Sequence, residues 1–399
     1  MGTSRDDSKR TCAICGSGET RVLFQQHFAV MSTGGLLDGY DVVVCERCGF
    51  CFAEDVPPQS ALDQYYREMS KYEHQDRMGD VSQSDWARLQ LIASYLKKHL
   101  RNPGARVMEI GCSTGTLLSM LKESGYQNVR GVDPSPVCAE VADRLYGIQV
   151  VSNTLSDLAI EGQSIDVLIL AGVLEHVRDV NTALLKCMTI LADDGLVYLA
   201  VPDASRYAEG EDAPFQEFSV EHINFFGPQS LTNLMNVSGF ARIDIEQGMV
   251  MSNRRTTTPV LHAVFTKRGS NRPSGYIRDT ETESGLARYI GQSRQADDRI
   301  QAAIAAIVDG GQPIIVWGTG AHTLRLLAST RLGQAKIRAF VDSNPRYHGK
   351  QLNNVPILPP EALANMNEPI LICSRVYQEE IAAQIRGDLH LQNELRMLY

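Results

Sequence analysis

The sequence of 399 residues has no long apolar run, no export signal and no cluster of basic residues. The first ten residues, MGTSRDDSKR, are polar, so we expect no secretory signal peptide. Residue 6 is Asp, where a myristoylation signal requires Ser or Thr. The most apolar stretch, residues 167–174, is far too short to cross a bilayer. We therefore expect a soluble, cytoplasmic protein without a membrane partner.

The charge balance disfavours a nucleic-acid partner. The chain carries 38 Lys and Arg against 47 Asp and Glu, a formal net charge of −9. A protein that binds the phosphate backbone needs a cationic surface, which neither the total nor any local run supplies. Hydrophobic residues at 43% and charged residues at 21% are ordinary for a globular protein and exclude a disordered or coiled-coil chain. The length predicts two or three domains.

The nine cysteines are unevenly distributed, and five lie within the first 51 residues. Four of them form two pairs with two residues between the partners: Cys12, Cys15, Cys45 and Cys48. This spacing lets both sulfurs of a tight turn face one ion, and the following Gly16 and Gly49 permit the positive φ of such a turn. Four thiolates favour a closed, structural zinc site over four reduced buried thiols. Cys51 could compete with Cys48, although the pair spacing favours Cys48.

Strand-like and helix-like segments alternate through the rest of the chain, which predicts parallel βαβ units and an α/β fold. An amphipathic helix begins near Ser84 and ends near residue 101, and apolar strand segments follow at residues 106–110, 129–132, 167–171 and 196–201. After a polar stretch and a long helix, a second alternation contains strand segments at residues 313–317, 339–341 and 370–373. We predict a four-cysteine zinc-binding domain, a central domain, a linker and a C-terminal α/β domain at residues 1–60, 61–267, 268–284 and 285–399.

A glycine-containing turn marks the first strand of the central domain. The segment VMEIGCSTG, residues 107–115, places Glu109, Gly111 and Gly115 where a strand leads into a helix. Such a turn lets a cofactor lie against the backbone and meet helix N-terminal amides. The third glycine of a dinucleotide fingerprint is not in register, which favours S-adenosylmethionine (SAM) over NAD. Asp133, which ends the next strand, is the acid expected at the ribose hydroxyls.

Two histidines are the candidate catalytic groups. His222 follows Glu221 in the segment EHINFF, and a histidine can act as a base near neutral pH. His176 follows the strand at residues 167–171, on the edge of the sheet where doubly wound folds bind ligands. Either histidine could instead be a packing or surface residue. Glu221 could orient a substrate hydroxyl.

In order, the glycine turn, Asp133, the segment around Asp157 and the segment around His176 resemble the successive motifs of class I SAM-dependent methyltransferases. With the cysteine pairs in front and the α/β unit behind, the whole chain resembles the sugar C-methyltransferases that act on nucleotide-linked keto-deoxysugars. That resemblance implies three parts: a zinc-binding domain, a class I methyltransferase domain and a Rossmann-like domain that helps to hold the nucleotide. It also implies that His222 is the general base.

The resemblance also implies which residues contact SAM and the substrate. It implies SAM contacts at Glu109, Gly111, Gly115, Asp133, Pro134, Asp157 and Ala171. Tyr72 is the best match to a substrate-binding loop, and the turn after residues 313–317 with Asp342 would bind the nucleotide. Within the family's hallmark segment, EHINFF here, Phe225 replaces a tyrosine. Three departures fall at substrate positions: Ser219 replaces a tyrosine, residues 70–78 match the substrate loop only loosely, and Ser374-Arg375 replaces a Trp-Asn pair. Ser113 stands where a glycine is usual.

Two alternatives remain open at this level. The same architecture could methylate oxygen or nitrogen on a saccharide or related metabolite. It could also be a zinc-stabilised nucleotide-binding protein without catalysis. The partner is expected to be a small molecule, and the chain a monomer or homodimer.

Overall fold

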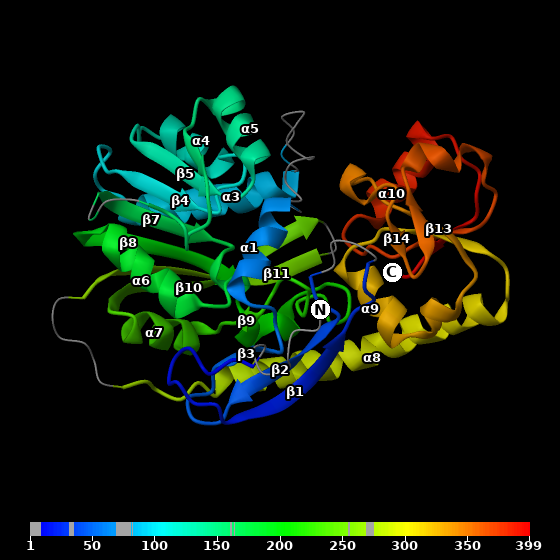
Figure 1. Cartoon of the computed structure of the whole chain (residues 1–399), viewed down its shortest axis with the longest axis horizontal. Helices are drawn as coiled ribbons and strands as arrows, with labels where there is room; N and C mark the ends of the chain where they lie inside the picture. Colours follow the sequence, from blue (N-terminus) through cyan, green and yellow to red (C-terminus); the bar gives the residue numbers. More distant parts are fainter. Residues whose placement is uncertain are drawn as a thin grey trace.

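The computed structural model describes residues 9–31, 36–68, 81, 83–159, 162, 164–253, 256–268 and 275–399. Within these ranges the chain forms three β-sheets with helices around them (Figure 1). The first sheet is antiparallel and has the order β1-β2-β3-β9. Its strands are β1 (Thr20–His27), β2 (Gly39–Cys45), β3 (Cys51–Glu54) and β9 (Asn224–Phe225). Helix α1 (Gln59–Glu68) follows β3.

The central sheet has seven strands in the order β10-β11-β8-β7-β4-β5-β6. Its strands are β4 (Val107–Ile110), β5 (Val129–Asp133), β6 (Val150–Ser152), β7 (Ile165–Ala171), β8 (Leu191–Pro202), β10 (Phe240–Asn253) and β11 (Thr256–Lys267). β4 to β8 run parallel, while β11 pairs antiparallel with both β8 and β10. The helices of this part are α3 (Gln83–His99), α4 (Thr116–Glu123), α5 (Pro136–Tyr146), α6 (Val180–Ile190) and α7 (Pro228–Val237). The carboxyl ends of β4, β5 and β7 therefore share one edge, which positions the candidate site.

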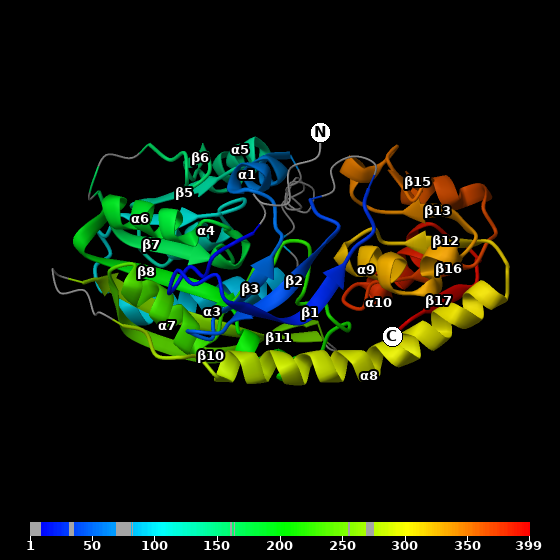
Figure 2. The same cartoon turned by 60° about the horizontal axis from the view of Figure 1, so that its bottom comes forward.

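The third sheet has the order β14-β15-β13-β12-β16-β17. Its strands are β12 (Ile314–Trp317), β13 (Ile337–Val341), β14 (Gln351–Leu352), β15 (Val355–Leu358), β16 (Ile370–Ile372) and β17 (Leu395–Met397), with helices α9 (Ala321–Ser329) and α10 (Gln378–Ala383). The long helix α8 (Glu281–Asp309) runs beneath the central sheet and the third sheet and joins them (Figure 2). The α/β fold class with two Rossmann-like units is confirmed.

The helix expected from near Ser84 is α3, which begins at Gln83. The structure corrects one boundary of the predicted linker. α8 begins at Glu281, inside the predicted linker at residues 268–284. Asp279, near the end of the predicted linker, is buried and held by two hydrogen bonds. Its N–H donates to the carbonyl of Cys48 at 2.9 Å, and its carboxylate accepts from the N–H of Ser230 at 3.0 Å.

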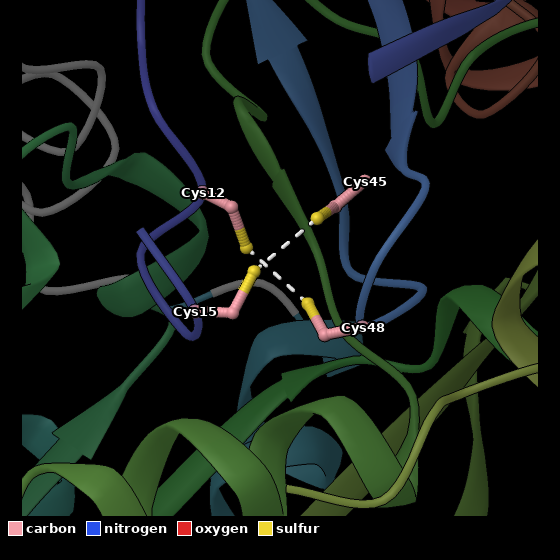
Figure 3. A group of neighbouring side chains, drawn as sticks. All are labelled: Cys12, Cys15, Cys45 and Cys48. Atoms are coloured by element: carbon pink, nitrogen blue, oxygen red, sulfur yellow. Dashed lines mark hydrogen bonds between the residues drawn. The ribbon is translucent and has the colours of Figure 1, made fainter. Parts of the chain in front are cut away.

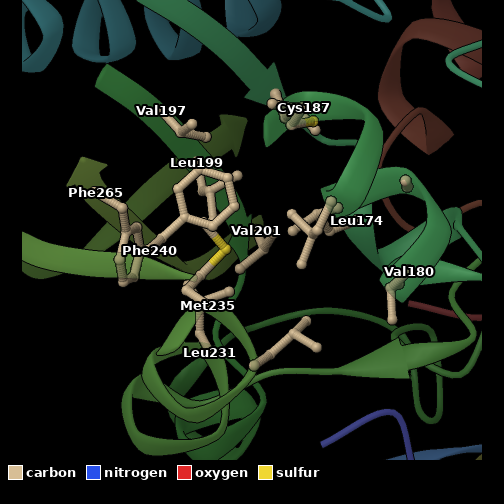
Figure 4. Close-up of a cluster of buried hydrophobic side chains, with 14 of the residues drawn as sticks. Leu174, Val180, Cys187, Val197, Leu199, Val201, Leu231, Met235, Phe240 and Phe265 are labelled. Atoms are coloured by element: carbon tan, nitrogen blue, oxygen red, sulfur yellow. The ribbon is translucent and has the colours of Figure 1, made fainter. Parts of the chain in front are cut away.

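The first sheet extends beyond residues 1–60, since β9 comes from the central part of the chain. Cys12, Cys48 and Phe226 belong to one buried cluster with residues of the central sheet. Figure 4 shows side chains of β8, α7 and neighbouring segments in this cluster. The cysteine segment therefore shares a hydrophobic core with the central sheet, because a short module alone buries too little apolar surface.

Candidate active site

The four paired cysteines converge on one point (Figure 3). The sulfurs of Cys12 and Cys48 are 3.3 Å apart, and those of Cys15 and Cys45 are 3.5 Å apart. Zn–S bonds of about 2.3 Å in a tetrahedron place sulfurs about 3.8 Å apart, so this donor set fits one zinc ion. Cys51 lies outside the group and belongs to a different buried cluster.

The turn of the second cysteine pair, Cys45 and Cys48, requires Gly49 for two reasons. Gly49 has φ +79°, a conformation that side chains rarely adopt. A Cβ at this position would also lie 1.9 Å from the carbonyl oxygen of Asp279. The segment that leads into α8 therefore packs directly on the cysteine site.

The turn after β4 has three residues in the left-handed region. Gly111 and Gly115 have φ +68° and +78°, and Ser113 between them has φ +49°. The N–H of Ser113 donates to Asp133 Oδ2 at 2.8 Å, while Oδ1 of the same carboxylate accepts from the N–H of Ser135 at 2.9 Å. Asp133 therefore fixes this turn to the end of β5.

A cavity of about 230 Å³ opens beside the turn. It is lined by Val81, Asp85, Arg88, Leu89, Glu109, Gly111, Cys112, Ser113, Thr114, Thr116, Leu117, Ala171, Gly172, Glu175, His176 and His222. Glu109 is buried, and its Oε2 has no hydrogen-bond partner among the described residues. Burial raises the pKa of Glu109 to about 8. A buried carboxylate that faces a cavity can accept hydrogen bonds from a ligand, which fits the amino and hydroxyl groups of SAM.

The sequence-predicted SAM residues do not all line this cavity. Glu109, Gly111 and Ala171 line it, whereas Asp133, Pro134, Gly115 and Asp157 are not among its lining residues. The Asp157 side chain is largely exposed and forms an ion pair with Arg67 of α1 at 2.7 Å. Asp133 is nearly buried beneath the turn.

The two candidate histidines lie side by side, and both line the cavity. The ring centroids of His176 and His222 are 5.1 Å apart. His176 Nδ1 is 2.9 Å from the carbonyl oxygen of Glu221, and the hydroxyl of Tyr65 donates to Glu221 Oε1 at 3.2 Å. Ser219 Oγ accepts from the N–H groups of Glu221 and His222 at 3.3 and 3.2 Å. The serine in the unusual position thus shapes the turn that presents His222.

Several residues at this site were missed by sequence reasoning. Glu175 is buried, and its Oε1 is 3.9 Å from His176 Nε2. Glu217 Oε2 is 3.8 Å from His222 Nδ1. Arg88 comes from the polar side of α3. Glu175 could have been found from its place beside His176, while Glu217 and Arg88 carry no sequence signal. The predicted Tyr72 lies outside the described residues.

The C-terminal domain repeats the turn-to-acid arrangement of the central domain. Gly318 has φ +99°, and both the N–H and the hydroxyl of Thr319 donate to Asp342 Oδ2, at 2.8 and 2.6 Å. Asp342 follows β13 as Asp133 ends β5. The two acids therefore have corresponding places in their sheets.

Comparison with known proteins finds methyltransferases that are similar to this chain. Residues 83–245 match a family model described as a methyltransferase domain, and residues 311–394 match one described as C2185-like, N-terminal. The C-methyltransferase NovU of Streptomyces niveus is 26% identical over 364 residues, which cover 87% of this chain and 83% of that protein. A probable S-adenosylmethionine-dependent methyltransferase of Mycolicibacterium smegmatis is 23% identical over 57% of this chain and 81% of its own length.

A crystal structure of the 1,6-didemethyltoxoflavin-N1-methyltransferase of Burkholderia thailandensis is also similar, with a TM-score of 0.41 and 20% identity over 56% of this chain and 98% of that chain. No helix within the described ranges is long and apolar enough to span a membrane.

Proposed function

We propose that this SAM-dependent methyltransferase transfers a methyl group to a carbon beside the keto group of a nucleotide-linked deoxysugar, with His222 as the base. The observation that carries the proposal is that His222, Glu109 and Gly111 line one cavity. A proton acceptor and the candidate cofactor turn are thus within reach of one substrate. The name of the relative NovU supports carbon as the methylated atom.

Each side chain at the site has a separate role in the proposed reaction. Bound SAM supplies an electrophilic methyl group on its sulfonium, and Glu109 with the Gly111 turn would hold it. His222 removes a proton from the carbon next to the keto group, and the electron pair becomes an enolate that takes up the methyl group. Glu221, whose Oε1 accepts a hydrogen bond from the Tyr65 hydroxyl, would bind a sugar hydroxyl. His176 would donate to the enolate oxygen.

The other two parts serve this centre. We assign one structural zinc ion to Cys12, Cys15, Cys45 and Cys48, where all four ligand positions are filled by the protein. The Thr319 turn and Asp342 are assigned to the nucleotide. We propose the three domains of the sequence analysis, at residues 1–60, 61–267 and 285–399, with β9 completing the first sheet and α8 leading into the third domain from Glu281. We also propose a cytoplasmic monomer or homodimer.

The test follows the C–H bond. In D₂O, the enzyme with S-adenosylhomocysteine should exchange deuterium into the carbon beside the keto group of a nucleoside-diphosphate keto-deoxysugar. His222→Gln should lower this exchange and methyl transfer by about 10²–10⁴-fold. If the methyl group is found on oxygen or nitrogen and no deuterium enters the carbon, the enzyme is an O- or N-methyltransferase instead. Binding of these sugars without turnover in the presence of SAM would indicate a non-catalytic protein.

A further inference from the structure

Glu217 is a buried neighbour of His222. Its Oε2 is 3.8 Å from His222 Nδ1, and it is absent from the residues that line the cavity. His222 does line the cavity. Because Nδ1 and Nε2 lie on different edges of the imidazole, the edge nearest Glu217 leaves Nε2 as the nitrogen for substrate.

The segment that carries both residues is fixed at each end. The N–H of Glu217 donates to the hydroxyl of Tyr289 of α8 at 3.0 Å. At the other end, Ser219 Oγ accepts from the N–H of His222 at 3.2 Å. Glu217 itself is buried, so its carboxyl group cannot turn freely to solvent. The main chain therefore holds the carboxylate and the imidazole next to each other.

We propose that Glu217 is a positioning residue that accepts the Nδ1 proton of His222, so that the basic lone pair of the imidazole lies on Nε2. This inference rests on the proposed function. In the reaction the substrate C–H bond breaks, its proton binds Nε2, and its electron pair remains on the substrate as the enolate. The imidazolium that forms then lies against the Glu217 carboxylate, which stabilises the positive charge. For this hydrogen bond to form, the 3.8 Å separation must shorten by a small rotation of either side chain.

The surroundings also set when Glu217 can accept a proton. Burial, then Asp212 and Glu175, raise the pKa of Glu217 to about 8, so its carboxyl group is largely protonated at neutral pH and becomes the acceptor for the Nδ1 proton as the pH rises. The reactive form requires that the carboxyl proton leave, and activity should therefore rise with pH. Other ionisable groups around the pair and the cavity are Asp85, Arg88, Glu109, His176 and Glu221, with the hydroxyls of Tyr65, Tyr66, Tyr207 and Tyr289.

Nitrogen-15 NMR of the histidine rings tests the pair in the full-length protein without substrate. The His222 signals are assigned by their loss in His222→Gln. At about pH 9, where the Glu217 carboxyl group is largely ionised, wild type should show the Nδ1–H tautomer. Glu217→Gln should lose this preference and lower the imidazole pKa by about one unit, because the nearby negative charge is gone. Glu217→Met, which also removes the charge, is the second variant. Asp212→Asn removes another buried acid of the segment and should leave the tautomer unchanged.

The two proposals fail separately. Unchanged tautomer and imidazole pKa in both Glu217 variants, with methyl transfer lost in His222→Gln, would overturn the Glu217 assignment and keep the base. Full methyl transfer in His222→Gln would instead remove the base. With a sugar that wild type methylates, Glu217→Gln should also move the acid limb of the kcat profile about one pH unit lower, which a purely structural role would not do.

Discussion

The guanidinium of Arg10 donates a hydrogen bond to the carbonyl oxygen of Ile223, the residue next to His222, at 3.0 Å. The same nitrogen donates to the carbonyl of Ala53 in β3 at 3.2 Å, and the other one donates to Asn224 Oδ1 at 2.7 Å. Arg10 is buried. Arg10, just before the first cysteine pair, thus fixes the main chain that carries His222, the proposed base.

Arg10→Ala should lower both stability and activity. The substitution leaves the buried carbonyls of Ala53 and Ile223 without this donor, at a cost of about 1–3 kcal/mol in the free energy of unfolding. Denaturant unfolding measures this cost, and methyl transfer under folding conditions measures the displacement of His222. Lys9→Ala, at the exposed neighbouring position, is the control and should change neither. Equal effects of the two substitutions would show that the Arg10 contacts do not hold the segment.

Metal analysis should find one zinc ion per chain. Cys48→Ala should remove it and unfold the N-terminal part, because four ligands are needed to close the site and the small sheet depends on the ion. Cys51→Ala is the matched control: this cysteine is also buried but lies outside the four-sulfur group, so zinc content should stay at one. A folded, active Cys48→Ala protein without metal would contradict a structural zinc.

Sequence patterns predicted the parts of the molecule that local rules determine. The apolar runs at residues 106–110 and 129–132 correspond to β4 and β5, and the cysteine spacing brought together the four sulfurs that the structure shows converging. The patterns could not reveal contacts between distant segments. β9 completes a sheet 170 residues earlier in the chain, and Arg10 reaches Ile223 because of that pairing. Glu217 likewise could not be recognised from the sequence, because only the folded turn brings it next to His222.

Ser113 should tolerate glycine better than a helical serine does. Its φ of +49° costs an L-residue about 1–2 kcal/mol, while glycine pays only backbone entropy there. Ser113→Gly should therefore leave the melting temperature unchanged or raise it. The same substitution at Ser119, inside α4, should lower stability by about 0.5–1 kcal/mol. Calorimetric unfolding of both variants makes the comparison, and a larger loss at Ser113 would show that its hydroxyl matters more than its φ.

Binding of S-adenosylhomocysteine should strengthen as the pH rises toward 8. Glu109, with its pKa raised to about 8 by burial, is mostly protonated at neutral pH, whereas the ionised form is the better acceptor for ligand N–H and O–H groups. At pH 8 about half of Glu109 is ionised and by about pH 9 nearly all of it, so its contribution should level off there. Titration calorimetry from about pH 6 to 9 measures the affinity. Glu109→Gln corrects for the ligand's own titration, and a wild-type profile parallel to that variant would remove Glu109 from the cofactor site.

Asp133 and Asp342 should separate the two ligand sites, because each acid fixes the turn of its own sheet. Asp133→Asn places an amide NH₂ opposite the N–H of Ser113 or Ser135, which disrupts the turn, so affinity for S-adenosylhomocysteine should fall more than about tenfold. Asp342→Asn has the same effect at Thr319 and should weaken binding of a nucleoside diphosphate such as UDP or TDP instead. Calorimetry with both probes on both variants gives four affinities. The assignment requires that Asp133→Asn weakens only S-adenosylhomocysteine and that Asp342→Asn weakens only the nucleoside diphosphate. If the nucleoside diphosphate binds wild type and Asp342→Asn equally well, the C-terminal turn is a packing element. A strand-to-helix turn needs such an acid for its own hydrogen bonds even without a ligand.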